Sequence, residues 1–515
     1  MKILLTYISG ATDRQDTYLN LLPAGLCYLQ SSLKEAGFDA TLGNFSGWSD
    51  VRIIQKITHL KPDIVGISQW THNRHTSLDL ARLIRSLNPH CTIIMGGAHA
   101  TFSYETVLAE DSPVDMVVLG EGEATLLEVA TCHAEGREWR NAKGIAYARQ
   151  GKIIVNPPRM ALTDLDSLPL PMLHLEHSFD IDPALQPEFI LTSRGCPSAC
   201  HFCSSPGFWN RRVRFRSPAN IVDEIMYNRN RFGLIYFSIR DDTFTADRQR
   251  TINFCRLLIK RKAYIIWNCQ SRVTALDEEL LSWMKLAGCE CIQLGVESGS
   301  PRILDKLGKS ITPSQIERSA AMIRDAGIHL SVYLISDVPG ETEEDIGQTI
   351  GLIRRIQPND GYVSPLAYYP GTPLFDDARA AGRIDDNIFE ISREAAVYAA
   401  GVPGRNAPRL LKALEESAHL DTHAFHSRNE QSEYCYTADV LAGEWYRQSG
   451  DRISAESRFR EITKREKDNP WGWYLLAELN SEWGNKRMAQ ECYIKVLKLV
   501  PRHGPSRAAV SAMGQ

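Results

Sequence analysis

The sequence predicts an α/β protein of about three domains, because two series of short apolar strands alternate with amphipathic helices and a strand-free helical tail follows them. Its 515 residues agree with that count at roughly 150 residues per domain. We expect an N-terminal α/β domain, a connector, a second α/β domain, a helical linker and an all-α tail. These parts cover residues 1–135, 136–185, 186–400, 401–430 and 431–515.

Composition is typical of a globular protein in a reducing compartment. The 58 Lys and Arg nearly balance 62 Asp and Glu, and the net charge of -4 argues against a nucleic-acid-binding surface, which is basic. No apolar run approaches the ~18 residues that span a bilayer, and the N-terminus lacks a signal-peptide cleavage pattern. We therefore expect a cytoplasmic protein without a transmembrane segment, whose twelve cysteines are buried thiols or metal ligands and not disulfides.

The first domain shows the pattern of a flavodoxin-like parallel sheet. Strands are expected at residues 2–8, 40–42, 63–68, 91–97 and 115–120. Helices at residues 23–37 and 77–89 would cover strands that are apolar on both faces. Ligands of such sheets bind beyond the carboxyl ends of the strands.

A second alternating series follows a proline-dense connector that contains a weak hairpin around Gly151. Its strands are expected at residues 189–195, 235–242, 264–272, 291–298, 329–336 and 361–369. Each gap is long enough for a helical crossover. Six units predict a partial (β/α)6 barrel, since eight would close a full one.

The tail repeats itself at a spacing of 34 residues. The matched pairs are Gly450 and Gly484, Ala455 and Ala489, Phe459 and Tyr493, and Ile462 and Val496. This period is typical of tetratricopeptide helix pairs. Two repeats are few, so we expect them to pack on the preceding helical segment or on a protein partner. An ordinary helical cap on the barrel is the alternative.

Three cysteines stand apart from the scattered others. Cys196, Cys200 and Cys203 form a C-x3-C-x2-C loop directly after a strand, and thiolates are the ligands of iron–sulfur centres. Structural zinc needs four ligands, for which His201 is the nearest candidate. Three buried structural thiols would not explain a loop flanked by glycine and prolines. The pattern favours iron–sulfur, with three ligands leaving one iron of a four-iron cluster open.

This loop resembles that of the radical S-adenosylmethionine (SAM) family. The resemblance implies a [4Fe-4S] cluster whose open iron chelates the methionine part of SAM. It also implies that an electron from an external donor, such as flavodoxin or ferredoxin, splits the sulfonium to a 5′-deoxyadenosyl radical. Phe202 matches the position near the adenine, although a plain core role is the alternative.

Further motifs follow in the family's order. Asp241 and Asp242 end the second strand, where carboxylates would accept from the methionine ammonium or merely cap the next helix. Glu297 and Ser298 resemble the strand-four motif beside the ribose and methionine carboxylate.

Two later segments, 339–344 and 369–374, also resemble family motifs. In the first of them the family usually has a glycine two residues before the proline. This chain has Asp337 there, which puts the close approach of that backbone in question.

The first domain resembles the cobalamin-binding domain of one branch of the same family. The matching segments are residues 22–26, 62–68, 95–100 and 119–123. The resemblance implies cobalamin contacts at Ser68, Gly96, Gly97, His99, Gly120, Glu121 and Gly122. A dinucleotide-binding fold is the main competitor, but no G-x-G-x-x-G follows the first strand. A module that holds no ligand is the other alternative.

A histidine that ligates cobalt is missing from its usual place. Cobalamin proteins that replace the cofactor's own base use D-x-H-x-x-G in the first strand–helix loop, whereas residues 10–16 contain no histidine. We expect no cobalt ligand from that loop. His99 would be a candidate, but a histidine after Gly-Gly is more often a loop residue bonded to backbone.

Together the motifs predict a cobalamin-dependent radical SAM enzyme that C-methylates an unactivated carbon of a small-molecule, lipid or tetrapyrrole-like substrate. In the usual scheme of the branch, one SAM makes methylcobalamin and a second supplies the radical. A radical oxidative cyclase or rearrangement enzyme is the alternative within the enzyme class. A non-catalytic cobalamin or redox sensor acting through the tail is the alternative outside it.

Overall fold

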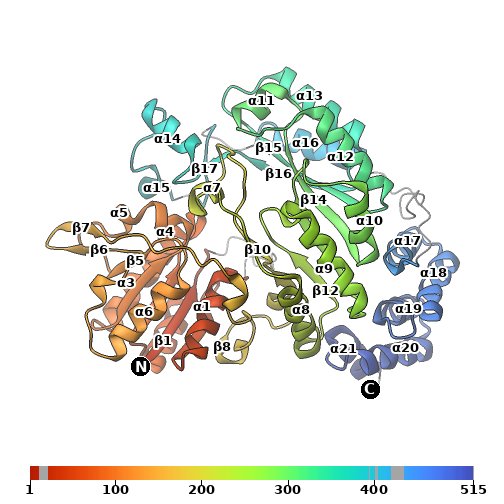
Figure 1. The fold of residues 1–515 in the computed structure, drawn as a ribbon, viewed down its shortest axis with the longest axis horizontal. Helices are drawn as coiled ribbons and strands as arrows, with labels where there is room; N and C mark the ends of the chain where they lie inside the picture. The colour runs from red at the N-terminus through yellow and green to blue at the C-terminus, as the bar shows by residue number, and fades with distance from the viewer. Residues whose placement is uncertain (11–20, 394, 401–403, 419–433, 514–515) are drawn as a thin grey trace. The chain divides into compact units, whose positions relative to one another are not determined.

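The computed structural model describes residues 1–10, 21–393, 395–400, 404–418 and 434–513 (Figure 1). The chain divides into two compact units, each described here by itself. The first unit consists of Met1–Gln186, Gly195–Arg214 and Ala367–Tyr398. The second consists of Pro187–Arg194, Phe215–Leu366 and Ala399–Gln515. Most of the loop at residues 10–16 and of the linker at 401–430 lies outside the described residues.

The first unit is built on an eight-stranded sheet in the order β7-β6-β5-β4-β3-β1-β2-β8. Its strands are β1 (Lys2–Tyr7), β2 (Asp39–Asn44), β3 (Ile64–Ser68), β4 (Thr92–Gly96), β5 (Met116–Val118), β6 (Ile145–Arg149), β7 (Lys152–Val155) and β8 (Ser178–Phe179). The pairs from β4 through β3 and β1 to β2 are parallel. All five residues of β3 are buried, as expected for a parallel strand covered on both faces.

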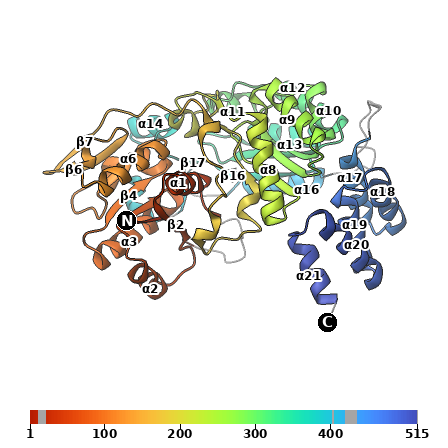
Figure 2. The same cartoon turned by 60° about the horizontal axis from the view of Figure 1, so that its bottom comes forward.

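Helices cover both faces of this sheet (Figure 2). They are α1 (Ala24–Glu35), α2 (Asp50–Leu60), α3 (Arg74–Leu87), α4 (Ala98–Phe102), α5 (Tyr104–Val107) and α6 (Glu123–Ala134). Ile53 and Ile57 of α2 join Leu80 and Ile84 of α3 in one core cluster with the sheet, because these apolar residues recur at helical spacing. Helices α1 and α6 pack together on the opposite face.

The region 136–185, predicted as a connector, extends this sheet. Strands β6 and β7 form an antiparallel hairpin around Gln150 and Gly151, which have φ of 51° and 71°, the backbone that a tight hairpin turn needs. The hairpin expected at Gly151 is therefore present. β6 also pairs with β5, and β8 pairs with β2 at the other edge. β7 and β8 are short strands and form the two edges of the sheet.

The second unit contains the predicted partial barrel, a six-stranded sheet in the order β16-β15-β14-β13-β12-β9. Its strands are β9 (Phe189–Ile190), β12 (Tyr236–Ile239), β13 (Ile266–Ser271), β14 (Cys289–Glu297), β15 (His329–Ser336) and β16 (Asp360–Pro365). All of its neighbouring strands are parallel. Trp267 lies in its core, with ring centroids 5.5 Å from Phe244 and 5.6 Å from Phe254.

Helices connect these strands as the crossovers of β-α units. They are α8 (Pro218–Phe232), α9 (Arg248–Lys260), α10 (Glu278–Leu286), α11 (Pro301–Lys306), α12 (Pro313–Asp325) and α13 (Glu343–Ile356), and α16 (Ala407–Ser417) follows the last strand of the sheet. Several begin at side-chain caps, for example Asp247 before α9, Asp277 before α10 and Thr342 before α13. Such caps satisfy the unpaired N–H groups of a helix start.

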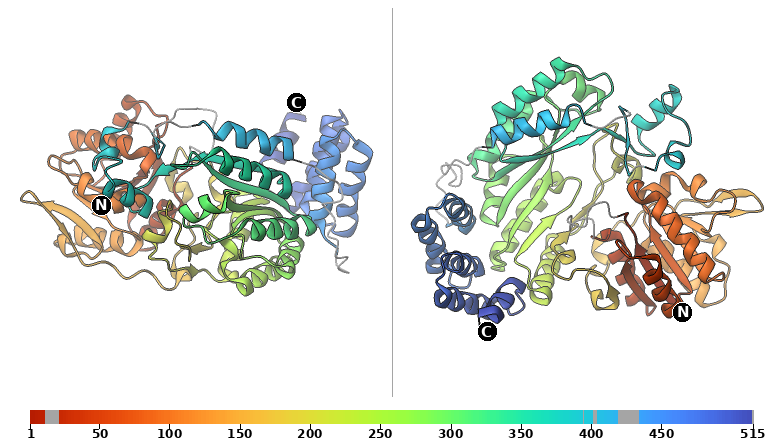
Figure 3. Two further views of the ribbon diagram at one scale, coloured as in Figure 1. Left: turned by 90° about the horizontal axis from the view of Figure 1, so that it is seen from above. Right: turned by 180° about the vertical axis from the view of Figure 1, so that it is seen from behind.

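The described part of the tail is helical (Figure 3). Its helices are α17 (Tyr436–Gln448), α18 (Arg452–Arg465), α19 (Pro470–Glu482), α20 (Lys486–Leu499) and α21 (Gly504–Met513). Residues 34 apart hold equivalent places: Gly450 and Gly484 end helices at φ of 81° and 77°, and Phe459 and Tyr493 are buried. The period is thus structural, and the tetratricopeptide assignment stays a prediction. None of the described helices is long and apolar enough to cross a membrane.

Candidate functional site

The two carboxylates predicted to hold the SAM ammonium, Asp241 and Asp242, lie in different surroundings. Asp241 is 1% exposed and accepts three hydrogen bonds, from Thr192 N at 2.6 Å and from the hydroxyls of Thr192 at 2.5 Å and Ser193 at 2.6 Å. Its carboxylate therefore anchors the segment that leads into the cysteine loop. Asp242, the next residue, is exposed and is the carboxylate of the pair that faces solvent.

Two buried arginines reinforce the same segment, and sequence reasoning missed both. Arg250 Nη2 donates to Thr192 O at 2.6 Å, and Arg216 Nη1 donates to Leu191 O at 2.8 Å. Arg216 also forms an ion pair with Glu224. Burial raises the pKa of Glu224, and Arg216 opposes that rise. These arginines follow no local motif, because their partners lie up to 58 residues away.

The carboxyl end of β14 places Glu297 in a conformation that ordinary residues avoid. Glu297 has a φ of 63° and is 7% exposed, and strained non-glycine backbone of this kind concentrates at functional sites. Lys309 Nζ donates to its Oε1 at 2.6 Å. The Ser298 hydroxyl lies 3.1 Å from that of Thr349. Both predicted residues thus lie at one strand end, on a fixed backbone.

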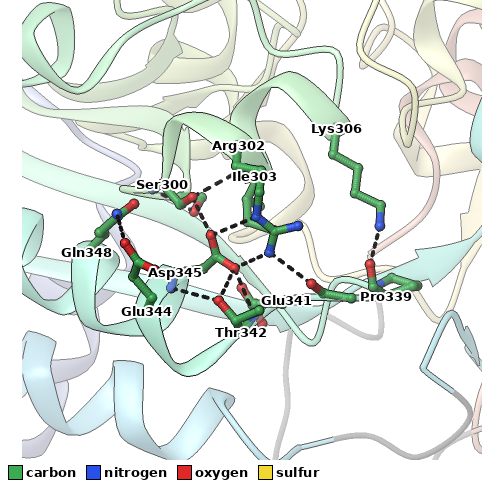
Figure 4. Close-up of polar contacts among 12 residues, drawn as sticks. Ser300, Arg302, Ile303, Lys306, Pro339, Glu341, Thr342, Glu344, Asp345 and Gln348 are labelled. Atoms are coloured by element: carbon green, nitrogen blue, oxygen red, sulfur yellow. Dashed lines mark hydrogen bonds and ion pairs between the residues drawn. The ribbon is translucent and has the colours of Figure 1, made fainter.

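Asp345 ties this motif to the loop after β15 (Figure 4). Its Oδ1 accepts from Ser300 Oγ at 2.6 Å, and its Oδ2 accepts from the backbone and hydroxyl of Thr342 at 2.8 and 2.7 Å. Arg302 forms an ion pair with the same carboxylate and donates to Gly340 O at 2.8 Å. Burial opposes the charge of Asp345, but hydrogen bonds from Arg302, Ser300 and Thr342 hold its pKa below the usual value.

Asp337, at the position where the family usually has a glycine, has a left-handed backbone conformation. Its φ is 58°, a left-handed value that aspartate tolerates better than most residues. Ser336 Oγ donates to its Oδ2 at 2.8 Å, and its own backbone N donates to Glu341 Oε2 at 3.0 Å. These hydrogen bonds hold the turn at Asp337.

The cysteine loop lies in the segment Gly195–Arg214, which groups with the first compact unit. It is closed at Gly195, where φ is 101° and an added Cβ would lie 2.0 Å from Arg212 O. Cys200 is buried, Cys196 and Cys203 are half-buried, and no disulfide joins any cysteine of the described residues. Three reduced thiols in one closed loop fit a [4Fe-4S] cluster. Phe202 is half-buried and His201 is exposed.

The loop packs against the turns at the carboxyl end of the first sheet. Arg214 Nη1 donates to Glu121 Oε2 at 2.7 Å. Cβ atoms built on Gly207 and Gly371 would lie 3.4 and 2.3 Å from the ring of Phe102. The predicted cobalamin residue Glu121 is thus an anchor of the cysteine loop.

The other predicted cobalamin residues gather at the ends of neighbouring strands. Ser68 and Gly96 end the paired strands β3 and β4, and Gly120 and Gly122 follow β5. At Gly97, φ is 103° and an added Cβ would lie 2.5 Å from Gln69 O. Only glycine allows so close an approach between the strand ends. This edge of half-buried glycines fits a bulky cofactor.

His99 is buried in the same region as a neutral imidazole. It is 5% exposed, its Nδ1 lies 3.2 Å from Thr71 Oγ1, and its ring centroid lies 5.4 Å from that of Phe389. Burial, followed by the charge of Arg74, lowers its pKa to about 3. These contacts describe a packed loop histidine that is held by its neighbours.

Comparison with known proteins decides the family. Residues 190–353 match the model of the Radical SAM superfamily, and residues 15–130 match that of the B12 binding domain. An uncharacterized methyltransferase of Pyrococcus horikoshii is 32% identical over 369 residues, 70% of this chain and 78% of that protein. The chain belongs to the radical SAM superfamily, in the group that carries a B12-binding domain. An anaerobic magnesium-protoporphyrin IX monomethyl ester cyclase of Rubrivivax gelatinosus is also 32% identical, over 73% of this chain and 70% of that protein.

Solved structures of radical SAM enzymes share the fold. The methyltransferase TsrM of Kitasatospora setae, with cobalamin and a [4Fe-4S] cluster bound, aligns with a TM-score of 0.66 at 18% identity, covering 90% of this chain and all of that one. OxsB with aqua-cobalamin and SAM bound aligns with a TM-score of 0.58 at 17% identity, covering 99% of this chain and 75% of that one. The predicted fold, the radical SAM enzyme class and the cofactors, a [4Fe-4S] cluster, SAM and cobalamin, are confirmed.

Proposed function

We propose that this radical SAM enzyme transfers a methyl group to an unactivated carbon of a small organic, lipid or tetrapyrrole-like substrate. The observation that carries the proposal is the attachment of the cysteine loop to the B12-binding sheet by Arg214 and Glu121. One compact unit then contains the residues proposed to hold the cluster and the cobalamin. A relative from Streptomyces wedmorensis, a cytidylyl-2-hydroxyethylphosphonate methyltransferase, is 29% identical over 66% of this chain, which supports methyl transfer.

In this proposal the cysteines hold the cluster, and a second set of residues holds SAM. Cys196, Cys200 and Cys203 are the ligands, and Phe202 lies beside the adenine. Asp242, Glu297 and Ser298 contact the methionine and ribose parts. Asp241 is a positioning residue, because its oxygens are taken by Thr192 and Ser193.

The cobalamin would lie on the glycine-rich strand ends of the first sheet. Ser68, Gly96, Gly97, Gly120 and Gly122 would line it, while Glu121 and His99 hold neighbouring segments in place. When bound, the cofactors supply a one-electron cleavage of SAM and a methyl-carrying corrin. The protein's own part is to fix their positions and to exclude water and oxygen.

The reaction needs an electron from outside the chain, for which we propose flavodoxin or ferredoxin in the cytoplasm. An oxygen-sensitive cluster is consistent with a reducing compartment. Membership in an enzyme family argues against the sensor alternative. A protein partner of the tail is supported by the 34-residue repeat alone.

Product analysis tests the proposal. The enzyme is reconstituted anaerobically with iron, sulfide and cobalamin, reduced, and given SAM with candidate acceptors that include the substrates of the relatives. A methyltransferase forms S-adenosylhomocysteine and 5′-deoxyadenosine in equal amounts with each methylated product. Formation of 5′-deoxyadenosine and an unmethylated, oxidised product would instead favour the cyclase alternative, which the relative from Rubrivivax gelatinosus supports.

The cysteine assignment has its own control. Cys200→Ala is expected to lose the iron content and the sulfur-to-iron charge-transfer absorption of the cluster. Cys132→Ala removes a buried thiol outside the loop, and it should keep both the iron content and the charge-transfer absorption. Full absorption and iron content in Cys200→Ala would contradict the assignment, and His201 would then be tested as a ligand.

A further inference from the structure

A cavity lies at the amino-terminal end of the barrel strands, within the second unit. It has a volume of about 340 Å³ and is lined by Tyr236, Ile266, Glu290 and His329 together with residues of α17 and α19. These four residues begin β12, β13, β14 and β15, whereas Glu297 ends its strand. The cavity is therefore separate from the predicted SAM residues, and its volume falls in the range of small-molecule sites.

Negative charge dominates its lining. The lining contains three carboxylates, those of Glu290, Glu444 and Glu478, and one guanidinium, that of Arg447. Burial raises the pKa of both Glu290 and Glu444, even though Tyr236 donates to Glu290, Arg447 donates to Glu444, and the charge of Lys285 opposes the rise at Glu290. Burial also lowers the pKa of His329 to about 4, and a neutral imidazole supplies no cation. A positively charged guest would stabilise these carboxylates.

Among the described residues, the lining atoms that lack a hydrogen-bond partner include Trp471 Nε1, Glu444 Oε1 and Arg447 Nε. Trp471 is 9% exposed, yet its Nε1–H finds no acceptor there. Glu444 accepts from Arg447 Nη2 at 2.6 Å through Oε2, while its covered Oε1 receives no hydrogen bond from that part of the chain. A buried polar group without a hydrogen-bond partner costs folding free energy. A guest that reached these atoms would supply the missing acceptor to Trp471 Nε1 and the missing donor to Glu444 Oε1.

Aromatic rings complete the lining. Trp445, Trp471 and Tyr474 all face the cavity, and the rings of Trp471 and Tyr474 meet edge to face with centroids 6.2 Å apart. Aromatic faces attract ammonium groups. We propose that this cavity binds a small protonated organic amine that also carries a hydroxyl or carbonyl oxygen. The ammonium donates to Glu444 Oε1, and the oxygen accepts from Trp471 Nε1.

Calorimetric titration of the full chain tests this site without any assay of SAM chemistry. Glucosamine and ethanolamine are the probes, and glucose and ethylene glycol are their neutral counterparts. We expect saturable binding of at least one amine and none of either neutral compound. The proposal is overturned if neither amine binds saturably, or if the neutral compounds bind as tightly as the amines.

Matched variants locate the binding. Glu444→Gln should weaken amine binding at least about tenfold, the effect of losing a charged hydrogen bond. Glu482→Gln is the control, because Glu482 accepts from Arg447 Nη1 at 2.5 Å but does not line the cavity. An equal loss in both variants would overturn the proposal.

A second pair of variants tests the donor. Trp471→Phe keeps an aromatic ring but removes the N–H. It should weaken the binding of the amines severalfold. Trp473→Phe is its control, since Trp473 Nε1 already donates to Lys467 O at 3.0 Å. Unchanged binding in Trp471→Phe, with its helix content intact by circular dichroism, would contradict the assigned contact.

Discussion

Arg214 and Glu121 form an ion pair at 2.7 Å across 93 residues of sequence. The pair joins the end of the cysteine loop to the turn after β5 of the B12-binding sheet. Glu121 Oε2 also accepts from Leu162 N at 3.1 Å. The side chains are 12% and 14% exposed, so each charge depends on the other for compensation.

Removing one member of this pair should destabilise the first unit. Arg214→Met is expected to lower the free energy of unfolding by about 3 kcal/mol, because it leaves a largely buried carboxylate without its partner. Denaturant titration measures the change. Arg140→Met, which breaks an exposed pair with Glu138, should cost below about 1 kcal/mol. Equal effects in the two variants would contradict the structural role of the Arg214–Glu121 pair.

Gly195 should be essential for the shape of the cysteine loop. Gly195→Ala would bring a Cβ to 2.0 Å from Arg212 O, so the loop must open and the iron content after reconstitution should fall. Gly37→Ala is the matched control, since Gly37 has a φ of 85° but open space around it. It should lose only about 1–2 kcal/mol of stability and keep its iron. A fully iron-loaded Gly195→Ala would show that the loop tolerates the side chain.

Because His99 is buried as a neutral imidazole, we expect the first unit to lose stability in acid. Its pKa is about 3 in the folded chain and ~6.5 when unfolded, so the unfolded state binds the extra proton between these values. The contribution of neutral His99 to the free energy of unfolding is complete above pH ~6.5. Below that pH it falls by up to ~1.4 kcal/mol per pH unit. His99→Gln should show a flatter dependence of unfolding free energy on pH between 4 and 6, a range set roughly by these pKa values. A slope equal to that of the unaltered protein would contradict the buried neutral histidine.

Asp345 should hold the strand-four motif in place. Asp345→Asn weakens the bonds from Ser300, Arg302 and Thr342, so we expect a loss of about 2 kcal/mol in stability and weaker SAM binding by equilibrium dialysis. Glu344→Gln changes a neighbour whose carboxylate meets Gln348 at 3.4 Å on the surface, and it should behave like the unaltered protein. Normal SAM affinity in a folded Asp345→Asn would separate this network from SAM binding.

Local patterns predict the strands and the places where function gathers. The buried strand β3 follows from a nearly continuous apolar run, and the convergence of Gly96 and Gly120 follows from parallel topology. The partners of Asp241 and Glu121 could not be predicted, since Thr192 and Arg214 lie 49 and 93 residues away. Long-range hydrogen bonds leave no periodic trace in the sequence.

The central claim is that the cluster held by Cys196, Cys200 and Cys203 binds SAM at an open iron. Electron paramagnetic resonance of the reduced, reconstituted protein, recorded before and after SAM is added, tests it most directly and needs no substrate. We expect a [4Fe-4S] signal whose shape changes with SAM, and no such signal in Cys200→Ala. A fully loaded cluster whose spectrum is unaltered by saturating SAM would contradict the account.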